Sequence, residues 1–270
     1  MIEFRNVTKT YPGGTAAVSE FSLTVPSHRT VALVGSSGSG KTTLLRMVNR
    51  MVEPTSGAVL IDDVDVATVG RVRLRRSIGY VLQAGGLLPH RTVADNVATV
   101  PVLTGTPRRA ARMRALELLD RVGLDASVAD RYPGQLSGGQ QQRVGVARAL
   151  AADPNILLMD EPFGAVDPVM RRELQHELRR LQADLGKTVV LVTHDIDEAF
   201  TVADEVVVLR EHAQVAQVGT PAQILARPAS DFVRRFVGLE TARRELHPTT
   251  VDGRTILVDR DGRPAGVLAP

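Results

Sequence analysis

The chain has 270 residues, of which 43% are hydrophobic and 23% charged, and it contains no cysteine. This composition excludes wholesale disorder, and the absence of thiols excludes disulfides, zinc–thiolate sites, iron–sulfur clusters and thiol catalysis. Thirty-three basic residues against 30 acidic ones leave a formal net charge of +3, and only 3% of residues are aromatic. With so small a basic excess and so few stacking side chains, we expect no binding to nucleic acid.

The sequence predicts neither a membrane-spanning helix nor a signal peptide. No run reaches the roughly 18 consecutive apolar residues that a membrane helix needs. The N-terminal segment MIEFRNVTKT has no apolar core of the kind found in signal peptides. We therefore expect the chain to stay in the cytosol unless a partner holds it at a membrane.

The first 35 residues predict strands and turns. Residues 2–4 begin one strand, and residues 21–25 alternate apolar with polar side chains, as in a half-exposed antiparallel strand. Residues 31–34 form a short apolar run, which is typical of a strand buried on both faces. After a glycine-rich loop, a helix is predicted from four apolar residues at helical spacing: Leu44, Met47, Val48 and Met51.

Helical periodicity dominates from about residue 92 to residue 152. Its clearest stripe ends before Gly123, a candidate C-cap, and consists of Ala115, Leu118, Leu119 and Val122. Apolar strands follow at 156–159, 189–192 and 206–209, with a helix between the first two at 168–185. This order predicts an α/β fold: a mixed, mainly parallel sheet core, an antiparallel β subdomain and an inserted α-helical subdomain.

Residues 35–42 read GSSGSGKT and match the phosphate-loop pattern G-x-x-x-x-G-K-[ST]. Small residues let backbone N–H groups converge on phosphate oxygens, and the following helix adds its positive end. In this pattern Lys41 reaches the β and γ phosphates, and the Thr42 hydroxyl holds Mg²⁺. The alternative is a glycine-rich turn with an incidental lysine. The predicted nucleotide-binding residues are Ser36, Ser37, Gly38, Ser39, Gly40, Lys41, Thr42 and Thr43.

Polar residues follow the next two buried strands. Asp160 and Glu161 end the strand at 156–159, and His194 follows the strand at 189–192. Ligands of open parallel sheets lie beyond the carboxyl ends of the strands, so Asp160 is a candidate ligand of Mg²⁺ and Glu161 a candidate general base. His194 becomes a candidate contact of the γ-phosphate. The alternatives are a solvated acidic pair and a structural histidine.

Residues 136–140 read LSGGQ, a second small-residue segment before a predicted helix. With the phosphate loop and the two carboxylates, this segment resembles the ATP-binding cassette (ABC) ATPases over residues 2–238. The resemblance implies that Tyr11 stacks on adenine and that Gln83 contacts Mg²⁺ and the attacking water. It also implies roles for His194 as the switch histidine and for Asp167 in the D-loop, residues 164–167, where Val166 replaces a usual leucine.

The same resemblance implies a dimer of cassettes, either two copies of this chain or this chain with a paralogue. In the family, two ATP molecules are buried between head-to-tail cassettes, and each is contacted by the LSGGQ segment of the other subunit. The residues carried over to that role are Ser137, Gly138, Gly139 and Gln140.

Residues 47–57, 86–93, 219–221 and 232–238 look like those of ATPases from quaternary-amine osmoprotectant importers, whose solutes are glycine betaine, choline, carnitine and proline betaine. The resemblance implies integral membrane permease subunits, an extracytoplasmic solute-binding protein and a peripheral position at the cytoplasmic face of the inner membrane. The alternatives are another importer, such as one for amino acids, a lipid or lipoprotein exporter, and a soluble ABC protein of translation or DNA repair. The last class usually has two fused cassettes or a long coiled coil, whereas this sequence has one phosphate loop and no sustained heptads.

We expect the ATPase domain to span residues 1–238 and a short tail to span residues 239–270. Residues 239–254 are charged and predict a linker, whereas residues 255–259 and 265–268 flank a turn at 261–264 and predict a β-hairpin. The hairpin resembles part of a cystathionine-β-synthase-type regulatory domain. The expectation is a remnant of such a domain, without its sensing module.

Overall fold

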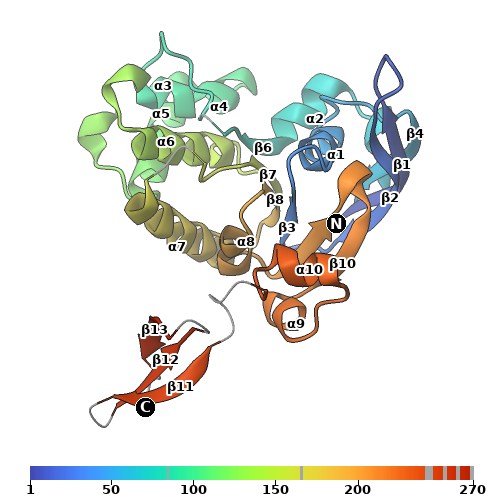
Figure 1. The fold of residues 1–270 in the computed structure, drawn as a ribbon. Coiled ribbons are helices and arrows are strands. Elements are labelled where there is room, and N and C mark those ends of the chain that lie inside the picture. Colours follow the sequence, from blue (N-terminus) through green and yellow to red (C-terminus); the bar gives the residue numbers. More distant parts are fainter. Residues whose placement is uncertain (84, 165–166, 241–245, 252–253, 260–261, 268–270) are drawn as a thin grey trace.

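The computed structural model describes residues 1–83, 85–164, 167–240, 246–251, 254–259 and 262–267. Figure 1 shows two lobes that meet along a central sheet, and a separate small sheet formed by the last part of the chain. Within the described residues, no helix is both long enough and apolar enough to span a membrane.

Six strands form the central sheet in the order β10-β9-β3-β8-β7-β6. Five of them run parallel, and β10 is antiparallel to β9. The strands β3, β7 and β8 are buried at every residue, as expected for apolar runs in a parallel sheet covered on both faces. The bounds are β3 Thr30–Gly35, β6 Ile78–Val81, β7 Ile156–Asp160, β8 Thr188–Thr193, β9 Glu205–Leu209 and β10 Val215–Gly219.

A second, antiparallel sheet has the order β2-β1-β4-β5. Its strands alternate buried with exposed residues, because one face packs inward and the other meets water. Two inward rings, Phe4 and Phe21, meet edge to face with centroids 5.3 Å apart. The bounds are β1 Ile2–Thr10, β2 Ala16–Val25, β4 Ser56–Ile61 and β5 Val64–Asp65. The α/β prediction with a mixed main sheet and an antiparallel β subdomain is therefore confirmed.

Neighbouring residues of each central strand face two different cores. In β3, Val31 and Leu33 pack with the antiparallel sheet and the helix α1, Lys41–Val48. Ala32 and Val34 pack on the opposite face with the helical lobe. Because side chains alternate between the two faces of each strand, one face of the central sheet packs on each lobe, and the sheet joins the two lobes.

The helical lobe contains α3 Val93–Val97, α4 Thr99–Leu103, α5 Arg108–Arg121, α6 Gly138–Leu150 and the long α7 Pro168–Leu185 (Figure 1). In α5 the predicted stripe of Ala115, Leu118 and Leu119 is buried. The remaining helices are α2 Arg71–Ser77, α8 Ile196–Val202, α9 Pro221–Ala226 and α10 Asp231–Phe236. Short 3₁₀ turns are η1 Val66–Thr68, η2 Ala126–Val128, η3 Pro133–Gln135 and η4 Glu211–Ala213.

Two local predictions were wrong. The helix predicted to include Met51 ends at Val48, because Arg50 adopts a left-handed conformation with φ of 54°, and Met51 is 54% exposed. The predicted linker at 239–254 contains a strand, β11 His247–Val251, which pairs with β12 Arg254–Val258, and β12 pairs in turn with β13 Pro264–Val267. β11 contains a proline, which an edge strand tolerates. Part of the turn predicted at 261–264, including Asp261, lies outside the described residues.

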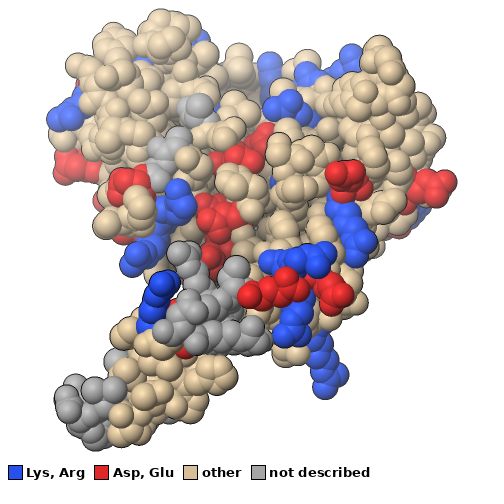
Figure 2. Space-filling view, in the orientation of Figure 1, with Lys and Arg blue, Asp and Glu red and all other residues tan. Residues whose placement is uncertain are grey.

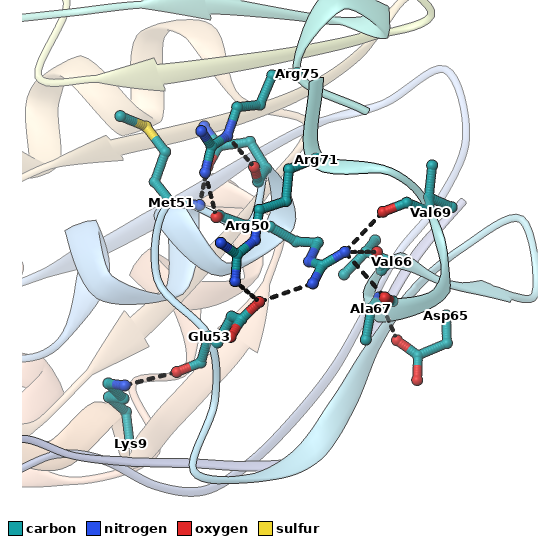
Figure 3. Close-up of polar contacts among 11 residues, drawn as sticks. Lys9, Arg50, Met51, Glu53, Asp65, Val66, Ala67, Val69, Arg71 and Arg75 are labelled. Atoms are coloured by element: carbon teal, nitrogen blue, oxygen red, sulfur yellow. Dashed lines mark hydrogen bonds and ion pairs between the residues drawn. The ribbon is translucent and has the colours of Figure 1, made fainter. Parts of the chain in front are cut away.

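A polar cluster fastens the end of α1 to η1 and α2 (Figure 3). The carboxylate Oε1 of Glu53 accepts from Arg50 and Arg71, each at 2.8 Å. Arg75 of α2 donates to the carbonyls that follow α1, and Arg50 donates to three carbonyls of the η1 segment, those of Val66, Ala67 and Val69. Because α2 leads directly into β6, the cluster fixes β6 relative to α1.

The cluster predicts how stability depends on pH. Hydrogen bonds from Arg50 and then Arg71 lower the pKa of Glu53 from 4.5 to about 2. The ionised carboxylate therefore stabilises the fold above about pH 4.5, and this contribution is lost as the pH falls towards 2. Glu53→Gln should unfold more easily than the wild type at pH 7, and the difference in unfolding free energy should shrink on acidification. Urea denaturation at several pH values measures this difference.

The matched control is Glu211→Gln, which changes the same group on an exposed residue of η4. It should leave the unfolding free energy close to that of the wild type. A Glu53→Gln defect that stayed constant from pH 7 to pH 2 would contradict the assignment of the effect to the ionised carboxylate.

Candidate functional site

A cleft of about 380 Å³ opens at the carboxyl edge of the parallel strands. The loop after β3, the residue after β7 and the residue after β8 all reach it, because parallel strands bring their carboxyl ends to one edge. Its lining consists of Ala17, Ser37, Gly38, Gly40, Lys41, Thr42, Thr43, Glu161 and His194. Residues predicted separately from the phosphate loop, β7 and β8 therefore meet in one place.

The phosphate loop turns sharply before α1. Gly40 precedes the helix with φ of 88°, and a Cβ there would lie 2.5 Å from the carbonyl oxygen of Ala17. Only glycine fits both constraints. A Cβ at Gly38, which has φ of 81°, would meet nothing within 4 Å, so this part of the loop is open on its outer side.

The ammonium group of Lys41 is held inside the loop. Its Nζ donates to the carbonyls of Gly35 and Ser36 at 2.8 Å each and to Oγ of Ser39 at 3.2 Å. Burial lowers the pKa of Lys41, while the charges of Glu161 and Asp160 oppose that shift. The loop thus positions a largely buried cation next to the opening where anionic phosphates would enter.

Asp160 is 7% exposed, and both of its carboxylate oxygens have neighbours. Thr42 Oγ1 donates to Oδ1 at 3.0 Å, and the Tyr80 hydroxyl donates to Oδ2 at 3.2 Å. Arg46 Nη2 lies 3.6 Å from Oδ2. Burial raises the pKa of Tyr80, which keeps the phenol protonated as a donor.

This donor set fits Mg²⁺. The adjacent hydroxyl of Thr42 and carboxylate of Asp160 are hard oxygen donors, and Mg²⁺ is usually held by one or two carboxylates together with substrate phosphates and waters. The described residues contain no group of three or more His, Cys, Asp or Glu able to form an all-protein metal cage. Figure 2 shows acidic side chains in the hollow between the lobes, where a cation would also reduce their repulsion of phosphates.

Glu161 joins Gln83 to His194. Its Oε2 accepts from Gln83 Nε2 at 2.9 Å, and its Oε1 lies 3.2 Å from His194 Nδ1. The backbone at Glu161 is left-handed, with φ of 45°, and its N–H donates to the carbonyl of Val192 in β8 at 2.9 Å. Strained backbone of this kind persists where neighbouring structure holds it, often at functional sites.

Tyr11 lies beside the phosphate-loop helix. Its hydroxyl is 3.5 Å from Thr43 Oγ1, and Lys9 Nζ lies 5.3 Å from the centre of its ring. The residue is 38% exposed, so part of its surface remains accessible next to the cleft.

The LSGGQ residues and Asp167 do not line this cleft. Ser137 caps α6 in the other lobe: its Oγ accepts from Gln140 N–H, and Gln140 Oε1 accepts from Ser137 N–H. Asp167 caps α7 by accepting from the N–H groups of Val169 and Met170 at 3.1 Å. Residues 165–166 of the D-loop, including Val166, lie outside the described residues.

Sequence reasoning missed Tyr80 and Arg46 as neighbours of Asp160. One sequence feature could have suggested Tyr80: it places a hydroxyl within the otherwise apolar strand 78–81, shortly before Gln83. Arg46 lies on a predicted helix among several arginines, and nothing in its local sequence distinguishes it.

Comparison with known proteins finds related sequences and a related fold. A carnitine transport ATP-binding protein of Listeria monocytogenes is 49% identical over 238 residues, which is 88% of this chain and 60% of that protein. A glycine betaine uptake system ATP-binding protein of Escherichia coli is 51% identical over 238 residues, 88% of this chain and 77% of that protein. This chain thus spans about 60% of the length of some curated relatives that it matches.

A solved dimeric cassette in a post-hydrolysis state with ADP and Pi superposes with a TM-score of 0.74. It is 36% identical and covers 82% of this chain and 99% of its own. The family model described as "ABC transporter" matches residues 18–164. With the phosphate loop, the carboxylates and the LSGGQ segment in the positions described above, this chain belongs to the ABC transporter family as an ATP-binding cassette.

Proposed function

We propose that this chain binds ATP with Mg²⁺ and hydrolyses it. The observation that carries the proposal is the Glu161 carboxylate, held between Gln83 and His194 at the phosphate-loop cleft. A carboxylate in this position can accept a proton from a water aimed at the terminal phosphate. A neighbouring ammonium and loop N–H groups can stabilise the charge of the transferring phosphoryl group.

Each residue has a defined part in this mechanism. Lys41 exchanges loop carbonyls for oxygens of the β and γ phosphates, and Gln83 orients the water. The water oxygen bonds to the γ-phosphorus, its proton passes to Glu161, and the bond to the ADP oxygen breaks. His194 donates to a γ-phosphate oxygen. When Mg²⁺ is bound by Thr42 and Asp160, it neutralises charge on the β and γ phosphates.

We also propose that two cassettes form a head-to-tail dimer. Ser137 lies at the start of α6 in the helical lobe, whereas the phosphate loop begins α1 in the other lobe (Figure 1). One chain therefore does not bring both segments to its own cleft. A second cassette would supply its LSGGQ segment and its Asp167 to complete the site.

The names of the relatives support a proposal about the solute. They are carnitine and glycine betaine transport proteins, so we propose that this chain powers a quaternary-amine osmoprotectant importer. It would bind permease subunits at the cytoplasmic face of the membrane, in a system with an extracytoplasmic solute-binding protein. The tail strands β11–β13 lie apart from the two lobes (Figure 1).

Glu161→Gln tests the catalytic part. The amide cannot act as the base, so ATP turnover should fall by about 10²- to 10⁴-fold, while ATP affinity stays close to wild type. The variant should accumulate as an ATP-bound dimer, which gel filtration with Mg-ATP detects. Glu211→Gln is the matched control and should retain wild-type turnover. Near-native hydrolysis by Glu161→Gln would remove Glu161 from the role of base.

Mixed dimers test the composite sites. If each site combines one chain's Lys41 with the other chain's Ser137, a dimer of Lys41→Ala with Ser137→Ala keeps one intact site. A dimer of wild type with the double variant keeps none. The first dimer should therefore hydrolyse ATP faster than the second. The opposite order, with sites formed within single chains, would refute the head-to-tail arrangement.

Transport assays test the solute class. The chain reconstituted with its permease in proteoliposomes should drive ATP-dependent uptake of labelled glycine betaine or carnitine when the solute-binding protein is present. Uptake should be absent with Lys41→Ala, whose phosphate contact is lost. Uptake of an amino acid instead, or export of a lipid, would contradict the osmoprotectant proposal and leave the ATPase proposal standing.

A further inference from the structure

Tyr80 and Asp160 belong to neighbouring parallel strands. Tyr80 of β6 is paired in register with Leu158 of β7, two residues before Asp160. Because side chains on a strand alternate with a period of two, Leu158 and Asp160 point to the same face, and so does Tyr80. This face is covered by α1, the helix that carries Thr42 and Arg46.

The two oxygens of Asp160 are held by different elements. Oδ1 accepts from Thr42 at the start of α1, and Oδ2 accepts from the Tyr80 hydroxyl of β6. With Oδ2 held by the neutral hydroxyl of Tyr80, Oδ1 faces Thr42, which lines the cleft. A hydrogen bond to a charged acceptor is among the stronger ones in proteins.

We propose that Tyr80 is a positioning residue that orients Asp160 for Mg²⁺ at the nucleotide site. The inference rests on the proposed function, because it concerns the same metal. Partners of a metal-ligating carboxylate tune affinity by holding the ligand in the binding orientation. Among the described residues, the hydroxyl of Tyr80 contacts Asp160 and also Arg46, which itself lies against the same carboxylate.

Arg46 explains why the hydroxyl matters. Its Nη2 lies 3.6 Å from the same Oδ2, so loss of the Tyr80 hydroxyl leaves an arginine as the nearest partner of this oxygen. The 45% exposed arginine side chain, which lies 3.6 Å from the oxygen, defines the carboxylate plane less sharply than a phenol on a strand of the central sheet. The cluster around Glu53 (Figure 3) fixes β6 relative to α1, which keeps the phenol within reach of Asp160.

The test compares nucleotide affinity with and without the metal. Binding of a non-hydrolysable ATP analogue is measured by calorimetry in Mg²⁺ and in EDTA, for the wild type and Tyr80→Phe. The gain in affinity that Mg²⁺ confers should fall by about tenfold in the variant, in line with the loss typical of outer-shell partners. Affinity in EDTA should stay unchanged, because the phosphate loop is intact.

Two further variants sharpen the result. Tyr132→Phe removes a tyrosine hydroxyl at a 49% exposed position in the helical lobe. In this variant Mg²⁺ should raise the nucleotide affinity as much as in the wild type. In an Asp160→Asn background, Tyr80→Phe should add less than about a twofold change, because a residue that acts through Asp160 is not additive with it.

Two results would overturn the inference. The first is a wild-type Mg²⁺ gain in Tyr80→Phe, whether affinity is unchanged or falls equally in Mg²⁺ and in EDTA, the second case indicating a general structural defect. The second result is a full tenfold effect of Tyr80→Phe in the Asp160→Asn background. If the wild type itself neither gains affinity from Mg²⁺ nor hydrolyses ATP, the proposed function fails as well. If the wild type does both and Tyr80→Phe matches it, only the role of Tyr80 fails.

Discussion

The buried carboxylate of Asp160 requires hydrogen-bond donors and a nearby positive charge. The nucleotide site is formed around the groups that supply them. A buried charge without hydrogen bonds is costly, by several kcal/mol. Asp160 is 7% exposed. Its carboxylate accepts hydrogen bonds from the hydroxyls of Thr42 and Tyr80 and lies near the guanidinium of Arg46. These groups come from the end of the phosphate loop, from β6 and from α1. The order β3-β8-β7-β6 and the position of α1 over one face of the sheet bring all of them to the end of β7.

Two neighbouring carboxylates at this edge of the sheet, those of Asp160 and Glu161, lie in different environments. Asp160 is the last residue of β7 and points towards the face covered by α1. Glu161 is the next residue, where a left-handed backbone turns its side chain to Gln83 and His194. The two adjacent acidic side chains thus lie in different places, that of Asp160 buried beside Thr42 and that of Glu161 at the opening of the cleft. A period of two alone would place them on opposite faces, and the φ of 45° at Glu161 sets where the second one points.

Much of this site could be predicted from the sequence, because its residues follow short apolar runs. Lys41 and Thr42 follow β3, Asp160 ends β7 with Glu161 directly after it, and His194 follows β8, so each is marked by a local pattern. The contact of Tyr80 with Asp160 could not be predicted in this way, because it depends on β6 lying next to β7 and on α1 lying over both. The end of α1 was missed for a similar reason: the apolar spacing continues to Met51, but Arg50 leaves the helix to bind η1.

The two segments that one chain keeps apart are nevertheless connected through the helical lobe. Arg148 of α6 is half-buried and donates to the carbonyls of Gly85 and Gly86 at 2.7 Å each, and burial lowers its pKa. These two hydrogen bonds attach the segment after Gln83 to the last turn of the helix that Ser137 begins. In the proposed dimer, Gln83 contacts the ATP of its own chain, whereas Ser137 contacts the ATP of the other. Arg148 lies in the last turn of α6 and Ser137 at its first, so α6 joins the two segments over its whole length. In the proposed dimer, a displacement of Gln83 would therefore act on the helix whose first residues face the neighbouring ATP.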